Sequence, residues 1–174
     1  GAVGIFADKG VGIENHGNIT LYGDGVVGIA GTKTDKITNY GTVSVTGTGA
    51  IGIYTALNTI VDNQGTIDVS GANGVGIIGI NGATIENSGS IKVTGTGDTH
   101  NIGVFLKNNS TGTVGTAGTV PQSVEVSGDN STGVLVSGGT SSLTMAGNVK
   151  VSGNSISGIV ADGRPITLNG PAEV

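Results

Sequence analysis

The sequence predicts an all-β fold, a right-handed parallel β-helix (β-solenoid) of about seven coils of about 24 residues, and three observations predict it. A triplet with a central glycine and mostly apolar neighbours recurs seven times. Each early triplet is followed by a phrase close to Ile-x-Asn-x-Gly-x-Ile-x-Val and by a glycine-rich turn. Within both phrases, apolar and polar residues alternate with the period of two that is typical of β-strands. The central glycines are Gly4, Gly28, Gly52, Gly76, Gly103, Gly133 and Gly158.

The spacing of the triplets sets the expected register. The first four central glycines lie 24 residues apart, and because this period is even, each apolar position keeps its parity from coil to coil. In the first coil Val3, Ile5, Ile13 and Ile19 all fall on odd positions, which we expect to face the interior. Three short strands per coil, separated by Gly or Asn corners, then stack in parallel about 4.8 Å apart into a rod about 30 Å long. The crossover rule favours a right-handed path.

Composition and charge argue against several classes of protein. The chain has 174 residues and a positive mean hydropathy of +0.20, so it has apolar surface to bury and disorder is disfavoured. The net charge is −5 and the seven Lys and Arg residues are scattered, so we expect no nucleic-acid partner. No run has the length of a transmembrane helix, so we expect no direct membrane span. The absence of cysteine excludes disulfides and thiolate metal sites and suits export through an oxidising compartment.

Two recurring positions support the register. The outward position between the last two apolar residues of each coil alternates in charge from the third coil onward, and opposite charges on adjacent strands contribute about 0.2–1 kcal/mol each. The Asn position of the second phrase accepts Met145 and Leu168 in later coils, so we expect it to face inward and its amides to bond to one another. The first column reads Thr20, Ser44, Asp68, Lys92, Glu125, Lys150 and Glu173, and the amides belong to Asn15, Asn39, Asn63 and Asn87.

The period fails in one stretch, where the fourth and fifth intervals lengthen to 27 and 30 residues. We expect irregular insertions near 96–101 and 107–122, which would emerge as surface loops and are either recognition loops or tolerated insertions without a function. Asp98, His100 and Lys107 are therefore candidate partner-binding residues. The chain begins within one repeat phrase and ends within another, so we expect residues 1–174 to be a single β-helix segment of a longer rod.

An outward column of the first phrase is apolar where a polar residue is expected. A continuous apolar strip of this kind often marks a contact surface. Either a partner binds there, or a neighbouring rod or another part of the same chain covers it. The column comprises Phe6, Ala30, Tyr54, Ile78, Phe105, Leu135 and Val160, of which Phe6, Tyr54, Ile78, Phe105 and Leu135 are the candidate partner-binding residues.

The search for catalytic chemistry favours a non-enzymatic protein without metal or cofactor. His16 and His100 are the only imidazoles, and they lie in different coils without a second ligand at metal-binding spacing. Asp62 and Glu86 take equivalent outward positions in adjacent coils, near the carboxylate separation that retaining glycosidases use. A β-helix enzyme that acts on polysaccharides therefore stays an alternative, by analogy of fold.

Several repeat phrases resemble those of a known family. VGIFA, IGIYT, VDNQG-TIDVSG and IENSG-SIKVTGTG are similar to the passenger repeats of type V autotransporters, above all the large Gly- and Asn-rich adhesins of fusobacteria. The likeness covers six of the seven coils and departs at residues 96–122. It implies a passenger that is secreted through an outer-membrane barrel outside this segment and is displayed at the bacterial surface. Such passengers attach to proteins or glycans of host or bacterial cells, and an autotransporter toxin passenger is the alternative within the family. No functional residue is carried over, because the shared positions are structural.

Overall fold

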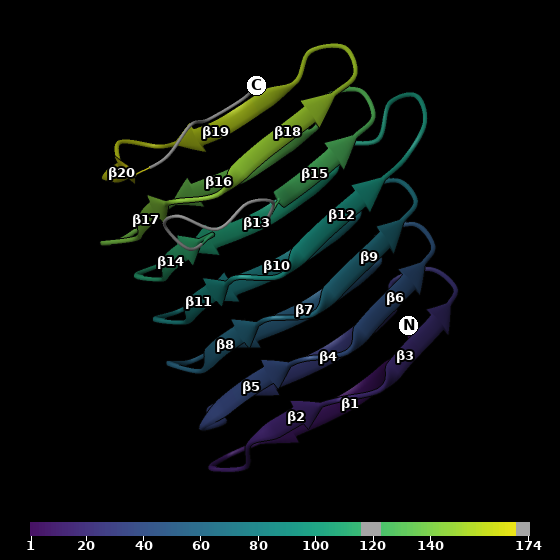
Figure 1. Ribbon diagram of the computed structural model, residues 1–174, viewed down its shortest axis with the longest axis vertical. Coiled ribbons are helices and arrows are strands. Elements are labelled where there is room, and N and C mark those ends of the chain that lie inside the picture. Colours follow the sequence, from purple (N-terminus) through teal and green to yellow (C-terminus); the bar gives the residue numbers. More distant parts are fainter. Residues whose placement is uncertain (116–122, 170–174) are drawn as a thin grey trace.

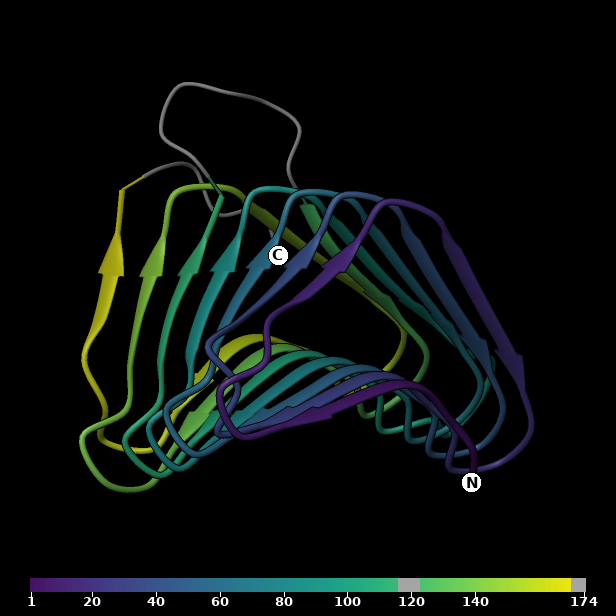
Figure 2. The ribbon, with the colours of Figure 1, turned by 90° about the horizontal axis from the view of Figure 1, so that it is seen from below.

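The computed structural model describes residues 1–115 and 123–169. In this part of the chain the backbone forms 20 strands that wind into a three-sided rod of stacked coils (Figure 1). Viewed along the rod from its N-terminal end, the chain runs clockwise as it recedes, which is the right-handed sense (Figure 2). The predicted parallel β-solenoid of about seven coils, with three strands per coil, is confirmed.

Each side of the rod is one parallel sheet of the described residues. The first sheet consists of β1 (Val3–Asp8), β4 (Val27–Thr32), β7 (Ile51–Ala56), β10 (Val75–Ile80), β13 (Ile102–Lys107), β16 (Thr132–Ser137) and β19 (Ser157–Ala161). The second sheet consists of β2 (Ile13–Asn15), β5 (Lys36–Asn39), β8 (Ile60–Asn63), β11 (Thr84–Asn87), β14 (Thr111–Val114), β17 (Ser142–Met145) and β20 (Ile166–Leu168). The third sheet consists of β3 (Asn18–Tyr22), β6 (Thr42–Thr46), β9 (Thr66–Ser70), β12 (Ser90–Thr94), β15 (Ser123–Ser127) and β18 (Asn148–Ser152).

The pairing keeps the register that the 24-residue period predicts. Ile53 aligns with Ile29 on one side and with Ile77 on the other. The alignment continues across the two longer intervals, since Ile77 pairs with Val104 and Val104 pairs with Val134. A shift by one residue would turn the buried face of a strand toward solvent, so the extra residues have to leave the strands.

The extra residues lie in connections between strands. Between β12 and β13 the chain passes through residues 95–101, where Asp98 forms an isolated parallel bridge with Asp129. One coil later β14 pairs with β11 and β17, so Thr111–Val114, within the expected range of 107–122, keep the regular pairing. Leu106 fills the interior beside Gly112, which replaces the isoleucine or valine of earlier coils at that position. The expected insertion then falls on residues 116–122, which lie outside the described residues.

Aliphatic side chains from all three sheets fill the interior of the rod. Ile53, Val61 and Ile67 come from different sheets of the third coil, and each is 0% exposed. The predicted alternation is confirmed in the second and third sheets, where β9 and β11 bury every second residue. Burial of one such side chain stabilises the fold by about 1.5–3 kcal/mol.

The predicted alternation is wrong at the triplet of the first sheet. Gly52 and Ile53 are consecutive residues that both face the interior, and a Cβ at Gly52 would overlap the Ile67 side chain of the third sheet. The residue before the glycine then turns outward, so Ile51 is half-buried and Val3, which was expected inside, is 47% exposed. The first sheet accordingly bows toward the interior (Figure 2).

The Asn position forms a continuous ladder inside the rod, as predicted. Asn15 donates its Nδ2 to Asn39 Oδ1 at 2.7 Å, Asn39 donates to Asn63 at 2.7 Å, and Asn63 donates to Asn87 at 2.6 Å. Asn87 ends the ladder by donating to the carbonyl of Gly89 at 3.2 Å. Each buried amide therefore has a partner in the next coil or corner, which avoids the desolvation cost of an unpaired polar group.

Truncation of one ladder member tests this interpretation. Asn63→Ala leaves the Asn39 donor and the Asn87 acceptor without their partners, so we expect the free energy of unfolding to fall by about 2–4 kcal/mol. Urea titration followed by far-UV circular dichroism measures the change. Gln64→Ala, at the exposed neighbouring position, is the control and should change stability by less than about 0.5 kcal/mol. Equal effects of the two changes would contradict a structural role of the ladder.

A second buried polar group lies at the corner between the first and second sheets. Thr59 Oγ1 accepts from the backbone N–H of Thr34 at 3.1 Å and donates to the carbonyl of Ala56 at 2.9 Å. Thr55 is also 0% exposed, but its Oγ1 has no hydrogen-bond partner among the described residues. The two hydroxyls, four residues apart, should therefore contribute to stability with opposite signs.

Isosteric replacement of each hydroxyl by a methyl group separates the two effects. Thr55→Val removes an unpaired buried hydroxyl, and we expect it to raise the free energy of unfolding by about 1 kcal/mol. Thr59→Val removes the partner of a buried N–H, and we expect it to lower that free energy by about 1–3 kcal/mol. Urea titrations of both variants give the values. A destabilised Thr55→Val protein would show that this hydroxyl has a bonding role.

Candidate interaction surface

The outer face of the first sheet is built from three columns of outward side chains, which we call the apolar face. The first column contains Val3, Val27, Ile51, Val75, Ile102, Thr132 and Ser157. The second contains Phe6, Ala30, Tyr54, Ile78, Phe105, Leu135 and Val160. The third contains Asp8, Thr32, Ala56, Ile80, Lys107 and Ser137, whereas Ala161 aligns with the inward Val136.

The apolar face is accessible and almost free of charge. Phe6 is 64% exposed at the N-terminal coil, and most other members of the first two columns are half-buried. Among the described residues of its strands, the charged side chains are Asp8 and Lys107, both in the third column. An apolar surface that runs the length of a rod is unusual for a protein without a partner.

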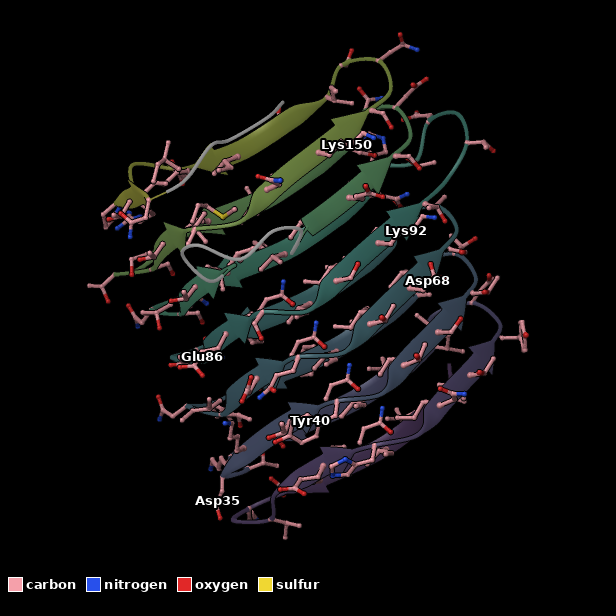
Figure 3. All side chains as sticks on the ribbon, in the orientation of Figure 1. Asp35, Tyr40, Asp68, Glu86, Lys92 and Lys150 are labelled. Carbon is pink, nitrogen blue, oxygen red and sulfur yellow. The ribbon has the colours of Figure 1, made fainter. Side chains whose placement is uncertain are left out.

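The other two sides of the rod are polar. The outward positions of the third sheet are mostly Ser, Thr and charged residues, and Figure 3 shows Asp68, Lys92 and Lys150 in a row along it. The second sheet carries Glu14, Asp62 and Glu86 on its outer side. The apolar character is therefore specific to the first sheet.

The structure brings some of the predicted partner-binding residues together and separates others. Phe6, Tyr54, Ile78, Phe105 and Leu135 share the second column of the apolar face, as the register predicted. Lys107 lies at the end of β13 on the same face.

Asp98 and His100 lie at the opposite end of β13, in the corner that precedes it. His100 Nε2 lies 2.9 Å from Asp98 Oδ1, which also accepts from Asn130 Nδ2 at 2.7 Å. These corner residues thus bond to one another, and the six-residue strand separates them from Lys107.

The first column of the apolar face was missed by the sequence interpretation. Val27, Ile51 and Val75 were placed inside because they share parity with the core residues that follow them. The glycine after each of them was the available signal, because an inward position without a side chain allows two consecutive residues to face the core. The apolar face is therefore wider than the predicted stripe.

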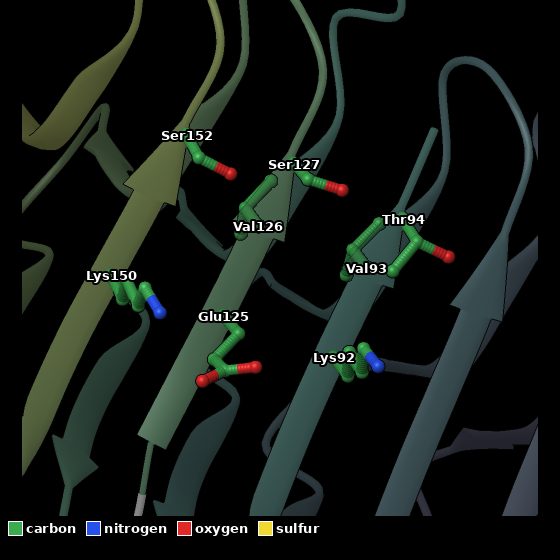
Figure 4. Close-up of a pocket in the computed structure, with 8 residues that line it drawn as sticks. All are labelled: Lys92, Val93, Thr94, Glu125, Val126, Ser127, Lys150 and Ser152. Carbon is green, nitrogen blue, oxygen red and sulfur yellow. The ribbon is translucent and has the colours of Figure 1, made fainter. Parts of the chain in front are cut away.

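The predicted charge column is confirmed as a column, although its side chains form no close ion pair among the described residues. Lys92 aligns with Asp68 and with Glu125, and Glu125 aligns with Lys150. A shallow hollow of about 90 Å³ lies among Lys92, Glu125, Lys150 and the Ser and Thr side chains beside them (Figure 4). Glu173, the last predicted member, lies outside the described residues. The alternating charges attract one another through solvent, so each pair contributes little to the stability of the fold.

The carboxylates of Asp62 and Glu86 lie side by side on the second sheet, at aligned positions of β8 and β11. Asp62 Oδ2 is bonded to Lys36 Nζ at 2.8 Å and to Gln64 Nε2 at 3.0 Å. The two carboxylates border a shallow hollow of about 230 Å³. The hydrogen bond that Lys36 donates to Asp62, reinforced by the charges of Asp62 and Glu86, raises the pKa of Lys36 above its ordinary value.

The histidines have other neighbours. His16 stacks on Tyr40 with ring centroids 4.7 Å apart, and its Nε2 lies 3.4 Å from Glu14 Oε2.

Across the residues that the structure describes, no three His, Cys, Asp or Glu side chains are grouped so that they could hold a metal ion. The same part of the chain contains no helix long and apolar enough to cross a membrane.

The Lys36–Asp62 pair gives a pH-dependent prediction. Because the folded-state pKa of Lys36 is raised, the pair stabilises the fold below the ordinary lysine pKa of 10.5, and this stabilisation is lost as the pH rises through the raised value. Lys36→Met should therefore cost less than about 1 kcal/mol at pH 7, since the lysine is partly solvated, and the difference from the parent should vanish near the alkaline limit.

Urea titrations of the parent and of Lys36→Met between pH 7 and pH 11.5 measure this difference. Lys33→Met, at an exposed position of the preceding corner, is the matched control. A stability difference for Lys36→Met that does not change with pH would show that packing, and not charge, stabilises this contact.

The fold and the surface together define a parallel β-solenoid with one apolar and two polar sides. No protein-family model, no curated protein and no solved structure matches this chain. The resemblance to autotransporter passengers therefore depends on the repeat phrases, and the structure supports the part of it that concerns the fold.

Proposed function

We propose that this chain is a passenger segment of a bacterial autotransporter adhesin, which acts as a stalk at the cell surface and supports attachment to host or bacterial cells. The observation that carries the proposal is the uninterrupted parallel stacking of similar coils, with three sheets in continuous register from end to end. About 24 residues add about 4.8 Å of length, so a chain of such coils produces a straight rod of constant cross-section.

The rod architecture supports a display role in physical terms. Each coil is bonded to its neighbours on three sides, so among the described strands those between the two ends of each sheet have both edges paired. Tight corners add to this, because a Cβ at Gly41 or Gly65 would overlap the backbone of the preceding coil. A rod of this kind holds a binding region at a fixed distance from the membrane.

Attachment requires a surface that a partner can recognise, and the apolar face is the best-supported one. A surface protein or glycan of the target cell is the class of partner that the proposal includes. The enzyme alternative depends on Asp62 and Glu86. The Asp62 carboxylate accepts hydrogen bonds from Lys36 and Gln64, so it belongs to a structural contact. We therefore favour a non-enzymatic role.

Display on a bacterium that lacks other adhesins tests the proposal. The chain is placed between a secretion signal and an outer-membrane translocator barrel, and antibody labelling of intact cells verifies its exposure. We expect adherence to host epithelial cells, or to bacteria that lack the chain, to rise several-fold above that of cells with the barrel alone. Ile78→Glu on the apolar face should lower adherence, whereas Ser44→Glu on the third sheet should not.

The outcomes of this assay separate the alternatives. A displayed chain that leaves adherence at the level of the barrel alone would contradict a binding role. Entry into or lysis of the target cells would favour the toxin passenger. Release of reducing sugar from surface glycans, abolished by Glu86→Gln, would favour the enzyme.

A further inference from the structure

The apolar face has the dimensions of a specific protein–protein interface. Seven strands about 4.8 Å apart and about six residues long, at about 3.3 Å per residue, span about 30 by 20 Å. In the arrangement proposed below, five coils of each copy overlap, so about 1,000 Å² would be buried in total, which is near the smallest size of a specific interface. The nearly uncharged first and second columns match the apolar centre that such interfaces have.

We propose that the occupant of the apolar face is a second copy of this chain, packed face to face and antiparallel about a two-fold axis at the third coil. The axis crosses the rods at Tyr54, so the first coil of one copy lies over the fifth coil of the other. The inference concerns the isolated chain in solution and does not depend on display at a cell surface, and a target-cell partner on the same face would compete with the second copy.

The two charges on the face favour this arrangement. Asp8 belongs to the first coil and Lys107 to the fifth, and both lie in the third column. An antiparallel two-fold axis at the third coil places Asp8 of each copy opposite Lys107 of the other, which forms two complementary pairs. A parallel face-to-face pair would lay both charges over the apolar first column, where they would lose solvation without a partner.

Each charge is available for such a pair. Asp8 accepts from Thr32 Oγ1 at 3.0 Å and lies 3.9 Å from Lys9 Nζ, so it retains acceptor capacity. Lys107 is exposed at the end of its strand. In the antiparallel arrangement these charges lie at the rim of the interface, where they select the orientation more than they add affinity.

The side chains of the second column are also complementary in this arrangement. Tyr54 meets Tyr54 at the axis, the small Ala30 meets Ile78, and Phe6 meets Phe105. On the outer side of the second sheet, Glu14, Asp62 and Glu86 outnumber Lys36, so like-charge repulsion disfavours contact through that side.

Sedimentation velocity of the purified chain tests the pairing. We expect a dimer at micromolar concentration, and Tyr54→Glu should weaken it by at least about tenfold because it buries two unpaired carboxylates at the axis. Ser44→Glu, a half-buried outward position of the third sheet, is the matched control and should leave the dimer unchanged. A monomer at all concentrations, or a dimer that Ser44→Glu weakens and Tyr54→Glu does not, would overturn the proposal.

Two further measurements test the orientation. Carbodiimide coupling should join Asp8 to Lys107, and since these residues lie four coils or about 19 Å apart in one chain, the amide product reports contact between copies. Lys107→Glu should weaken the dimer, and the added change Asp8→Lys should restore it. A dimer without the Asp8–Lys107 product and without this restoration would exclude the antiparallel arrangement.

Discussion

The parallel stacking of coils in exact register is the constraint on which the rest of the structure depends. Because each residue lies beside its equivalent in the neighbouring coils, a choice at one position is repeated along the rod as a column. A column of glycines such as Gly41 and Gly65 permits the close corners. In the column of asparagines, the side-chain amides of neighbouring coils hydrogen-bond to one another. A smaller side chain in one column of the interior is compensated by a larger one in another column. In the fifth coil, Leu106 fills the space that Gly112 leaves. Stability, surface pattern and interaction surface all follow from this repetition.

The same repetition sorts the outer surface into three sides of different character. The third sheet shows mostly hydroxyls and alternating charges, the second shows carboxylates with Lys36 among them, and the first shows apolar side chains. The difference arises at the triplet, where an inward glycine forces its preceding residue outward and so adds an apolar column. The inward glycine of each triplet, which allows close packing of the core, therefore also widens the apolar face, for which we propose a partner.

Much of the fold could be predicted from the sequence, because the period, the alternation and the Asn position each report a repeated physical requirement. The orientation of Ile51 could not, since strict alternation does not allow for two consecutive inward residues. Strand β14 was not recognised in the sequence because Gly112 stands where earlier coils have isoleucine or valine, and the compensating Leu106 lies on another sheet. The bond from Lys36 to Asp62 reaches diagonally into the next coil, which only the lengths and rotamers of the two side chains decide.

The asparagine ladder has a direction that affects how such a rod could change in length. Asn15, Asn39 and Asn63 each donate to the amide of the following coil, so the junctions between the first four coils are chemically identical. Loss of residues 40–63, one full period, would join Asn39 to Gln64 and allow Asn39 to donate to Asn87 in place of Asn63. Duplication or deletion of whole 24-residue units would therefore preserve the register, whereas the gain or loss of a single residue within a strand would shift it.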